Sequence, residues 1–159
     1  MTDMLVKLYE LPETLPDFSS LVPSGIKIRK PIGSEKSLLV QWVRENFGDF
    51  WANEMDIGLS RLPISCYIAQ HEKEVIGFAC YDAAALGYFG PVGVLEAFQG
   101  QGIGKALMLA CLIEMRLKGY GYAIIGWVGP QEFYEKTIGA IAIPDSTPGI
   151  WKDWLGNSE

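Results

Sequence analysis

The feature that most constrains this chain is a glycine-rich turn between a short apolar run and a long apolar helix, within residues 92–107. Gly100, Gly102 and Gly104 stand at alternate positions, so the backbone can turn tightly and point several amide N–H groups the same way. The first N–H groups of a helix have no partner inside it and lie at its positive dipole end. The sequence therefore predicts a strand–turn–helix unit that binds a phosphate-bearing ligand.

Individual residues of this turn exclude two common phosphate-binding motifs. A P-loop needs Ser or Thr where this chain has Ala106, and Gly where it has Gln99. A dinucleotide fingerprint that starts at Gly100 needs its third glycine where Lys105 stands. We therefore expect neither a nucleoside triphosphate nor a dinucleotide in this turn.

The same turn resembles the phosphate loop of the GNAT superfamily of N-acetyltransferases. Gln99, Gly102 and Gly104 fit the pattern Gln/Arg-x-x-Gly-x-Gly/Ala, and Val94 precedes Gln99 by five residues. The resemblance covers residues 26–145 and implies acetyl-CoA as the cofactor, with its pyrophosphate in the loop. The residues that it assigns to cofactor binding are Val92, Val94, Gln99, Gly100, Gln101, Gly102, Ile103, Gly104 and Lys105.

Length and charge limit the number of domains and the partners. A chain of 159 residues with 49% hydrophobic residues is long enough for one domain with a real core. Its net charge of −6 argues against nucleic acid or an anionic membrane as a partner. Because Lys105 is the only cation of the loop, backbone amides have to bind a polyanionic cofactor.

The longest apolar run, residues 106–113, is too short to span a membrane, and no signal-peptide pattern opens the sequence, so we expect a cytoplasmic protein.

The pattern along the chain predicts a single α/β domain with a central mixed sheet flanked by helices, in which residues 1–25 form an arm with a short edge strand. The resemblance implies that this sheet is splayed and that residues 26–159 form the acetyl-CoA-binding N-acetyltransferase domain. Alternating apolar residues predict strands, and helical spacing predicts helices. The expected strands are 4–9, 26–29, 64–70, 75–81, 86–95, 122–128, 140–143 and 150–155, and the expected helices are 36–47, 50–59, 102–118 and a short one that ends at Gly139.

The strand expected over residues 86–95 contains Pro91, which cannot donate to a sheet ladder. A bulge where neighbouring strands separate would explain this proline. In the GNAT family the equivalent strand splays from the next parallel strand, and pantetheine fills the gap. The resemblance therefore implies that Val92 and Val94 lend backbone groups to the pantetheine arm. It also implies that the Val92 N–H stabilises the developing oxyanion.

A second segment carries the resemblance into catalysis. Phe133-Tyr134-Glu135-Lys136, followed by Gly139, is similar to the Phe-Tyr-Glu-Lys…Gly segment of many GNAT enzymes. There the tyrosine protonates the departing thiolate. The resemblance implies that Tyr134 is the general acid.

A general base is less clearly marked. Glu54 is the first choice, because Trp51 stands one turn earlier and could line the same pocket. Many GNAT enzymes pass this proton through water, so a base is not required. We interpret His71, in a polar hairpin tip, as solvated, and the same holds for three other carboxylates: Asp56, Asp82 and Glu96.

The aromatic residues allow more than one interpretation, whereas the cysteines allow one. Five aromatics could form an apolar or cation-binding acceptor site, or simply pack in the core: Trp51, Tyr88, Phe89, Trp127 and Trp151. Trp151 and Trp154 could instead mark a homodimer surface. The cysteines have neither metal-site nor disulfide spacing and are expected to be buried thiols: Cys66, Cys80 and Cys111.

These interpretations give one main hypothesis and one rival. The main hypothesis is an acetyl-CoA-dependent N-acetyltransferase that moves acetyl to a primary amine of a small molecule or protein, by direct attack in a ternary complex. The rival is a non-catalytic acyl-CoA-binding sensor that regulates a partner. No recognisable pattern names the acceptor, which segments 44–63 and 144–159 are expected to select.

Overall fold

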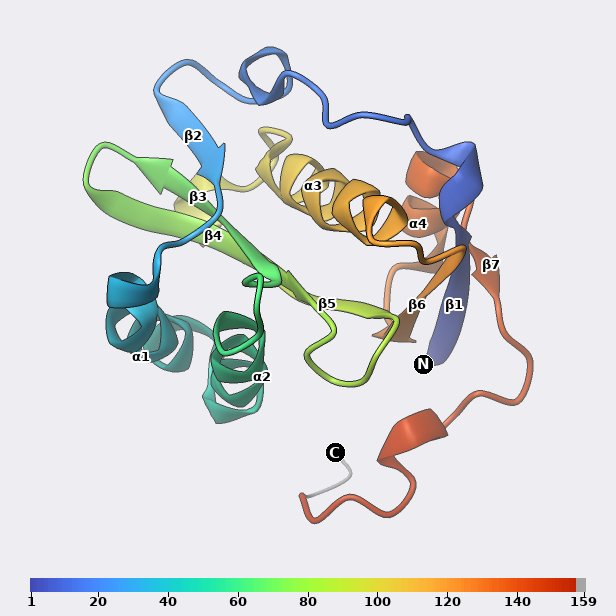
Figure 1. Ribbon diagram of the computed structural model, residues 1–159. Helices are drawn as coiled ribbons and strands as arrows, with labels where there is room; N and C mark the ends of the chain where they lie inside the picture. Colours follow the sequence, from blue (N-terminus) through green and yellow to red (C-terminus); the bar gives the residue numbers. More distant parts are fainter. Residues whose placement is uncertain (157–159) are drawn as a thin grey trace.

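A seven-stranded mixed sheet runs through the computed structural model, which describes residues 1–156 (Figure 1). The strand order is β2-β3-β4-β5-β6-β1-β7, and every neighbouring pair is antiparallel except β5 and β6. The strands are β1 (Thr2–Lys7), β2 (Ile26–Arg29), β3 (Cys66–His71), β4 (Glu74–Tyr81), β5 (Tyr88–Val94), β6 (Tyr122–Val128) and β7 (Ile141–Ala142).

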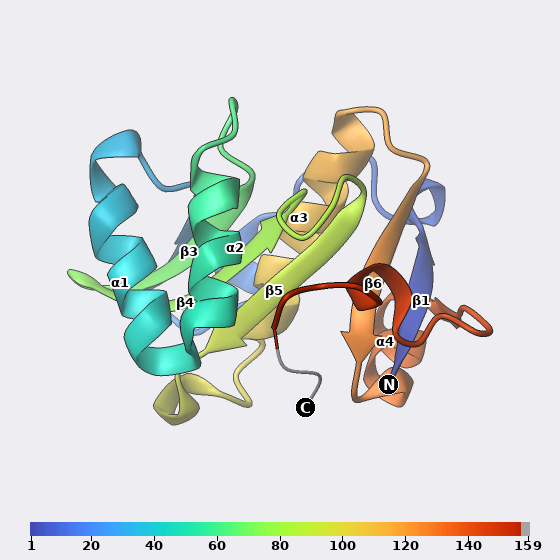
Figure 2. The same ribbon diagram turned by 90° about the horizontal axis from the view of Figure 1, so that it is seen from below.

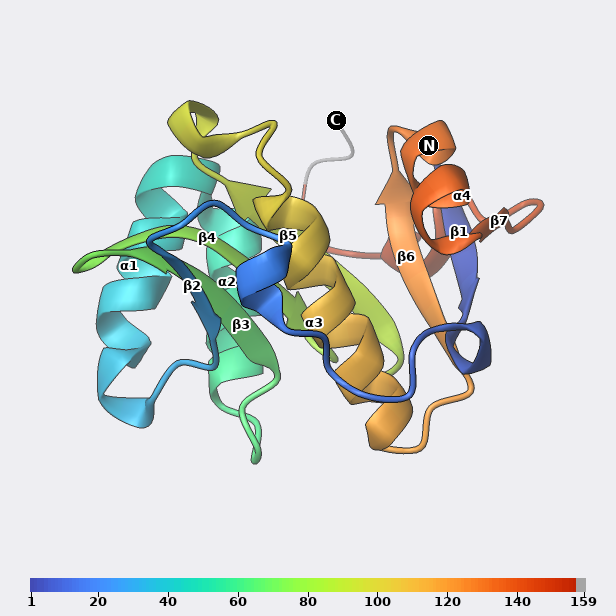
Figure 3. The same cartoon turned by 90° about the horizontal axis from the view of Figure 1, so that it is seen from above.

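Helices cover both faces of this sheet. Figure 2 shows α1 (Lys36–Phe47) and α2 (Asp49–Leu59) together on one face, and Figure 3 shows α3 (Ile103–Leu117) and α4 (Gln131–Ile138) on the other. The α1–α2 pair closes a core with β3 and β4 that includes Leu39, Met55 and Phe78. No helix within the described residues combines the length and the apolar character that crossing a bilayer requires. Each face of the sheet thus has its own hydrophobic core.

Helix α3 is apolar around most of its circumference because two layers cover it. Leu107, Met108 and Leu112 are fully buried or nearly so. One layer is the sheet, and the other is the N-terminal segment, which crosses over α3 (Figure 3). Val22 of that segment belongs to the same core, and Arg116 donates a hydrogen bond to the Leu11 carbonyl. The second layer therefore explains why α3 is not amphipathic.

The predicted β–α–β unit is confirmed, with β5 and β6 parallel and α3 as the crossover between them. The strands and helices from residue 26 to residue 143 lie at or close to their predicted positions. The thiols of Cys66, Cys80 and Cys111 are buried, as expected.

Two expectations about the ends of the chain are wrong. The first strand is not at an edge, because β1 pairs with β6 on one side and with β7 on the other, and its Met4 and Val6 are fully buried. No strand forms over residues 150–155, where the chain makes a short 3-10 turn at Gly149–Trp151. Pro148 and Gly149, which has a φ of +62°, set that turn, and the ring of Trp151 packs on other aromatics.

The predicted splay of the sheet is also confirmed. β5 and β6 pair only where Tyr88 faces Ile124 and Phe89 faces Ile125. Beyond these pairs the two strands diverge (Figure 2). The register of β4 on β5 shifts between Ala79 and Tyr81, opposite the Gly90-Pro91 segment. The bulge thus lies where the missing N–H of proline interrupts the ladder.

Candidate active site

Within residues 1–156, one edge of β5 has no strand beside it after Phe89. On the other edge, the Leu95 N–H donates to the Ile76 carbonyl at 2.9 Å, and Val92 and Val94 pair with β4. Hydrogen-bonded and non-hydrogen-bonded pairs alternate along an antiparallel ladder. The N–H groups of Val92 and Val94 therefore point away from β4, toward the opening between β5 and β6.

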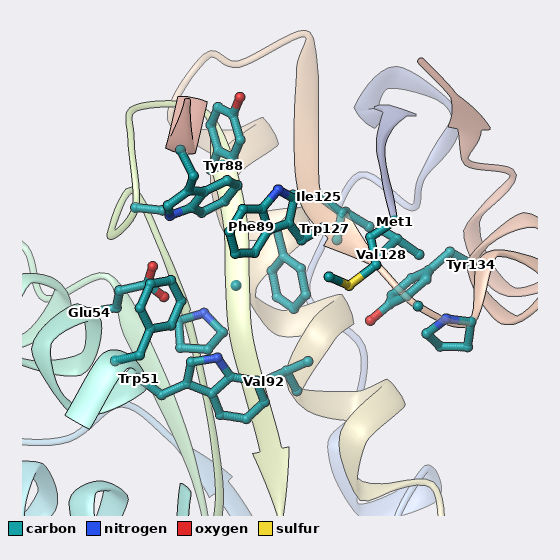
Figure 4. Close-up of a pocket in the computed structure, with 18 residues that line it drawn as sticks. Met1, Trp51, Glu54, Tyr88, Phe89, Val92, Ile125, Trp127, Val128 and Tyr134 are labelled. Carbon is teal, nitrogen blue, oxygen red and sulfur yellow. The ribbon is translucent and has the colours of Figure 1, made fainter. Parts of the chain in front are cut away.

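A cavity of about 350 Å³ lies in this opening (Figure 4). Val92 of β5, Glu54 of α2 and Tyr134 of α4 all line it. Figure 4 shows Glu54 and Tyr134 on opposite sides of the β5 strand, with Val92 between them. The fold thus brings the three residues predicted to be catalytic, which lie far apart in sequence, to one cavity.

Glu54 lies on the α2 side of the cavity and is half-buried. Burial alone raises the pKa of its carboxyl to about 7, and no hydrogen-bond donor or cation within residues 1–156 offsets that effect. Trp51, one turn earlier on α2, lines the same cavity. Glu54 is therefore a carboxylate that can exchange a proton near neutral pH.

Tyr134 lies on the opposite side, in the first half of α4. Pro130 precedes this helix, and Gly139 ends it with a left-handed φ of +66°. The Tyr134 hydroxyl points toward β5 (Figure 4), and burial raises the pKa of the phenol. The phenol consequently stays protonated at neutral pH and can donate.

A smaller hollow of about 240 Å³ lies at the start of α3, lined by Val94, Phe133 and residues of the glycine-rich loop. Gly100 and Gly102 have φ values of +79° and +84°, which favour glycine. A Cβ on Gly102 would lie 2.9 Å from the Leu21 carbonyl oxygen. The loop therefore needs glycine at residue 102 to keep its shape.

Gly104 has a different role from Gly102. A Cβ there would approach no protein atom more closely than Val94 Cγ2, at 3.7 Å, so the fold itself does not need this glycine. Gly104 lines the hollow, where a Cβ would take up space. At the start of α3 the Ala106 N–H donates to the Gly102 carbonyl at 3.0 Å. The N–H groups that precede it in the helix have no carbonyl partner one turn earlier.

The remaining loop residues fall into three groups. Gln99 Nε2 donates to the Val94 carbonyl at 3.1 Å and so ties the loop to the end of β5. Ile103 and the exposed Lys105 line the hollow with Gly100. Gln101 is exposed and is not among the residues that line it.

The cavity and the smaller hollow lie along the same open edge of β5. Val92 lines the cavity and Val94 the smaller hollow, while the adjacent Tyr134 and Phe133 of α4 do the same. The edge offers backbone N–H groups along β5 and a helix start at one end. These features fit an extended ligand with a phosphate group at one end and an amide-bearing arm.

Two of the polar residues interpreted as solvated lie in other surroundings. Asp82 is buried, and hydrogen bonds replace the water around its carboxylate. Its Oδ1 accepts from the Gly87 N–H and its Oδ2 from the Tyr120 hydroxyl, both at 2.7 Å. It therefore shapes the loop before β5. His71 is half-buried, and its ring lies 5.7 Å from that of Phe98.

The other two carboxylates are exposed, as expected. Asp56 forms an ion pair with Lys36 at 3.0 Å, and Glu96 lies in the turn after β5. Neither lines the cavity.

All five aromatic candidates line the cavity: Trp51, Tyr88, Phe89, Trp127 and Trp151. Phe89 is almost fully buried, while Trp127 and Trp151 are half-buried with their rings 4.4 Å apart. The ring of Trp154 packs within the chain, 5.2 Å from that of Phe50. Sequence reasoning missed Phe50 and Met1 in the lining, since neither lies in a recognisable motif.

Comparison with known proteins agrees with this geometry. Residues 63–137 match the family model described as the acetyltransferase (GNAT) domain. No curated protein matches the chain. Solved structures that cover 89% of the chain include a GCN5-related glucosamine N-acetyltransferase region of a fungal multi-domain GH3 β-N-acetylglucosaminidase, with a TM-score of 0.69 and 16% identity. A Drosophila protein has a TM-score of 0.64 and 16% identity, and a GCN5-related N-acetyltransferase from Sphaerobacter thermophilus has a TM-score of 0.59 and 19% identity.

The chain spans less than half the length of each of these structures: 19%, 47% and 48%, respectively. At such identities the likeness establishes the fold alone. The chain has the GNAT fold, and its residues 63–137 match the GNAT acetyltransferase domain.

Proposed function

We propose that this protein is an acetyl-CoA-dependent N-acetyltransferase that acetylates a primary amine. The observation that supports this most strongly is the open edge of β5. It presents the Val92 N–H to the cavity that Glu54 and Tyr134 line, and the Val94 N–H beside the glycine-rich loop.

The residues that would hold the cofactor follow from the two hollows. Free amides at the start of α3, with the loop before it, would bind the pyrophosphate by hydrogen bonds and by the helix dipole. This suits a chain of net charge −6, in which Lys105 is the only cation of the loop. The N–H groups of Val92 and Val94 would bind the pantetheine arm.

Acetyl-CoA would supply the acetyl group as a thioester. The amine nitrogen would bond to the acetyl carbon as the carbon–sulfur bond breaks, with the sulfur leaving as a thiolate. Residues of this chain transfer the protons and stabilise the negative charge in this reaction. Glu54 accepts a proton from the amine, with a pKa of about 7 that suits a base at neutral pH. Tyr134 donates a proton to the departing sulfur. The Val92 N–H stabilises negative charge on the carbonyl oxygen.

Thiol release with a panel of primary amines tests this proposal. We expect release that depends on the added amine, with the acetylated amine identified by mass spectrometry. Binding of acetyl-CoA without turnover of any amine would overturn the proposal and favour an acyl-CoA sensor.

A further inference from the structure

Five rings pack together beside the cavity, and we call this cluster the aromatic wall: Phe50, Tyr88, Trp127, Trp151 and Trp154. They come from α2, β5, β6 and the C-terminal segment. The Trp127 and Trp151 rings lie 4.4 Å apart, the Phe50 and Trp154 rings 5.2 Å, and the Tyr88 and Trp151 rings 6.3 Å. All except Trp154 line the cavity, so the wall presents ring surface to whatever enters.

Trp127 is held in place by polar contacts at both ends. Its backbone has a φ of +50°, a strained value for a large residue, and its N–H donates to Asp3 Oδ1 at 3.0 Å. Asp3 is only 4% exposed. The indole Nε1 donates to the Pro148 carbonyl at 3.1 Å. With its polar edge satisfied, the ring offers an apolar face.

The backbone of β6 makes room for the second indole. A Cβ on Gly126 would lie 2.6 Å from Cη2 of Trp151, so this ring packs directly on the strand. Trp151 nevertheless remains half-buried at the cavity. Packing of a hydrophobic core requires neither a strained backbone at Trp127 nor a glycine under the Trp151 ring. Both features therefore favour a surface that is shaped to bind a ligand.

Charge narrows the kind of molecule that fits. Glu54 is the single acidic residue among the described residues that line the cavity, and none of these is Lys, Arg or His. No side chain of the lining would therefore supply a counter-charge to a carboxylate or phosphate on the acceptor, which makes burial of such a group unfavourable. A second ammonium group would face rings without a second carboxylate. The lining thus suits one amine and no other charge.

We infer that the acceptor is a small primary amine on an aromatic body without other charged groups. Its nitrogen faces Glu54 and Val92, and its ring packs on the aromatic wall. A cavity of about 350 Å³ suits a molecule of one or two rings. This inference rests on the proposed function and specifies the substrate class.

A panel of four amines tests the class at fixed acetyl-CoA. 2-Phenylethylamine is compared with butylamine, which lacks the ring, with phenylalanine, which adds a carboxylate, and with spermidine, which adds ammonium groups. We expect kcat/KM for 2-phenylethylamine to exceed each of the others at least about tenfold. A value for butylamine or spermidine equal to or above that for 2-phenylethylamine overturns the inference.

Binding is measured without turnover by titrating the tryptophan fluorescence of the protein alone with 2-phenylethylamine. Trp151→Leu should weaken binding about tenfold, and Trp151→Phe, which keeps a ring, should restore most of it. Tyr9→Leu is the control, because Tyr9 makes an edge-to-face contact with Tyr122 and neither ring lines the cavity. Equal affinity for butylamine and 2-phenylethylamine in the unaltered protein contradicts the inference, even if Trp151→Leu does not fold.

Calorimetry with acetyl-CoA separates the two possible failures. Cofactor binding with no preference for the aromatic amine overturns the acceptor class and leaves acetyl transfer standing. Ring-dependent amine binding without cofactor binding supports the acceptor class and overturns acetyl transfer.

Discussion

The two ends of the open β5 edge are built from different parts of the chain. At the α3 end, the hollow is formed largely by one continuous stretch, Val94 to Lys105, with glycines and main-chain amides. At the other end, side chains of α2, β5, β6, α4 and the C-terminal segment meet around the cavity. Main-chain amides bind any phosphate, whereas side chains distinguish one small molecule from another. We therefore propose that the edge pairs a general cofactor site with a specific acceptor site.

The two ends also use charge differently. Under the proposal, the start of α3 would bind phosphate through amides and a helix dipole, because Lys105 is exposed and is the one cation of the loop. The cavity instead holds a carboxylate, Glu54, whose pKa is raised by burial. We expect changes in the cavity to alter turnover and changes in the loop to alter cofactor affinity.

Tyr134→Phe should produce the largest effect. Loss of the proton donor should lower kcat about 100-fold, within the usual range for general acid–base catalysis, while the acetyl-CoA Kd stays the same. Steady-state kinetics and calorimetry measure the two quantities. Tyr122→Phe is the control, on an exposed tyrosine outside the cavity. A kcat within twofold of the unaltered protein would refute the role of Tyr134.

Glu54→Gln should lower kcat/KM about 30-fold at pH 8, because a proton acceptor is removed. In the unaltered protein kcat/KM should rise with pH through about 7, where Glu54 loses its proton, and the variant should lack this step. A pH profile from 5.5 to 9, on the order of ten points, measures it. An unchanged step in Glu54→Gln would assign the proton to another group or to water.

The same substitution should stabilise the fold. Burial raises the pKa of Glu54 from an ordinary 4.5 to about 7. Proton binding by this carboxyl therefore stabilises the folded state, fully below pH 4.5, and this contribution is lost as pH rises through 7. Glu54→Gln should therefore raise the free energy of unfolding at pH 8 by about 2 kcal/mol, after allowance for residual exposure. Urea unfolding at pH 4.5 and pH 8 measures this. A variant less stable than the unaltered protein at pH 8 would contradict the burial argument.

Gly104→Ala should weaken acetyl-CoA binding about tenfold, because the added Cβ enters the hollow. The unfolding midpoint should stay the same, since the nearest protein atom is 3.7 Å from that Cβ. Gly121→Ala is the matched control, at a glycine where a Cβ meets nothing within 4 Å. Gly102→Ala is a poorer test, because a Cβ 2.9 Å from the Leu21 oxygen would disturb the loop itself. Undiminished affinity in a folded Gly104→Ala protein would place the phosphate elsewhere.

Lys105→Gln should have the smallest effect, about a twofold to threefold rise in the acetyl-CoA Kd at low salt, since exposed charges contribute little. The difference should vanish at high salt, where screening is strong. Lys73→Gln, in the β3–β4 hairpin, is the control. A loss of tenfold or more would show that the loop depends on this side chain rather than on its amides.

The glycine-rich loop could be predicted from the sequence, because its conformation depends on adjacent residues. The cavity could be predicted only in part, because it depends on contacts between residues far apart in the chain. Gly100, Gly102 and Gly104 are adjacent in sequence, and their backbone requirement is local. The left-handed Trp127 depends instead on Asp3, which lies 124 residues away. The place of β1 inside the sheet, the turn at Gly149–Trp151 and the burial of Asp82 likewise depend on contacts that no local pattern encodes.

The central claim is that the open edge of β5 and the amides at the start of α3 bind acetyl-CoA. Titration calorimetry of the unaltered protein with acetyl-CoA tests it most directly. We expect one site per chain, with a Kd on the order of micromolar, a common strength for small ligands. No heat of binding up to millimolar acetyl-CoA would contradict the claim.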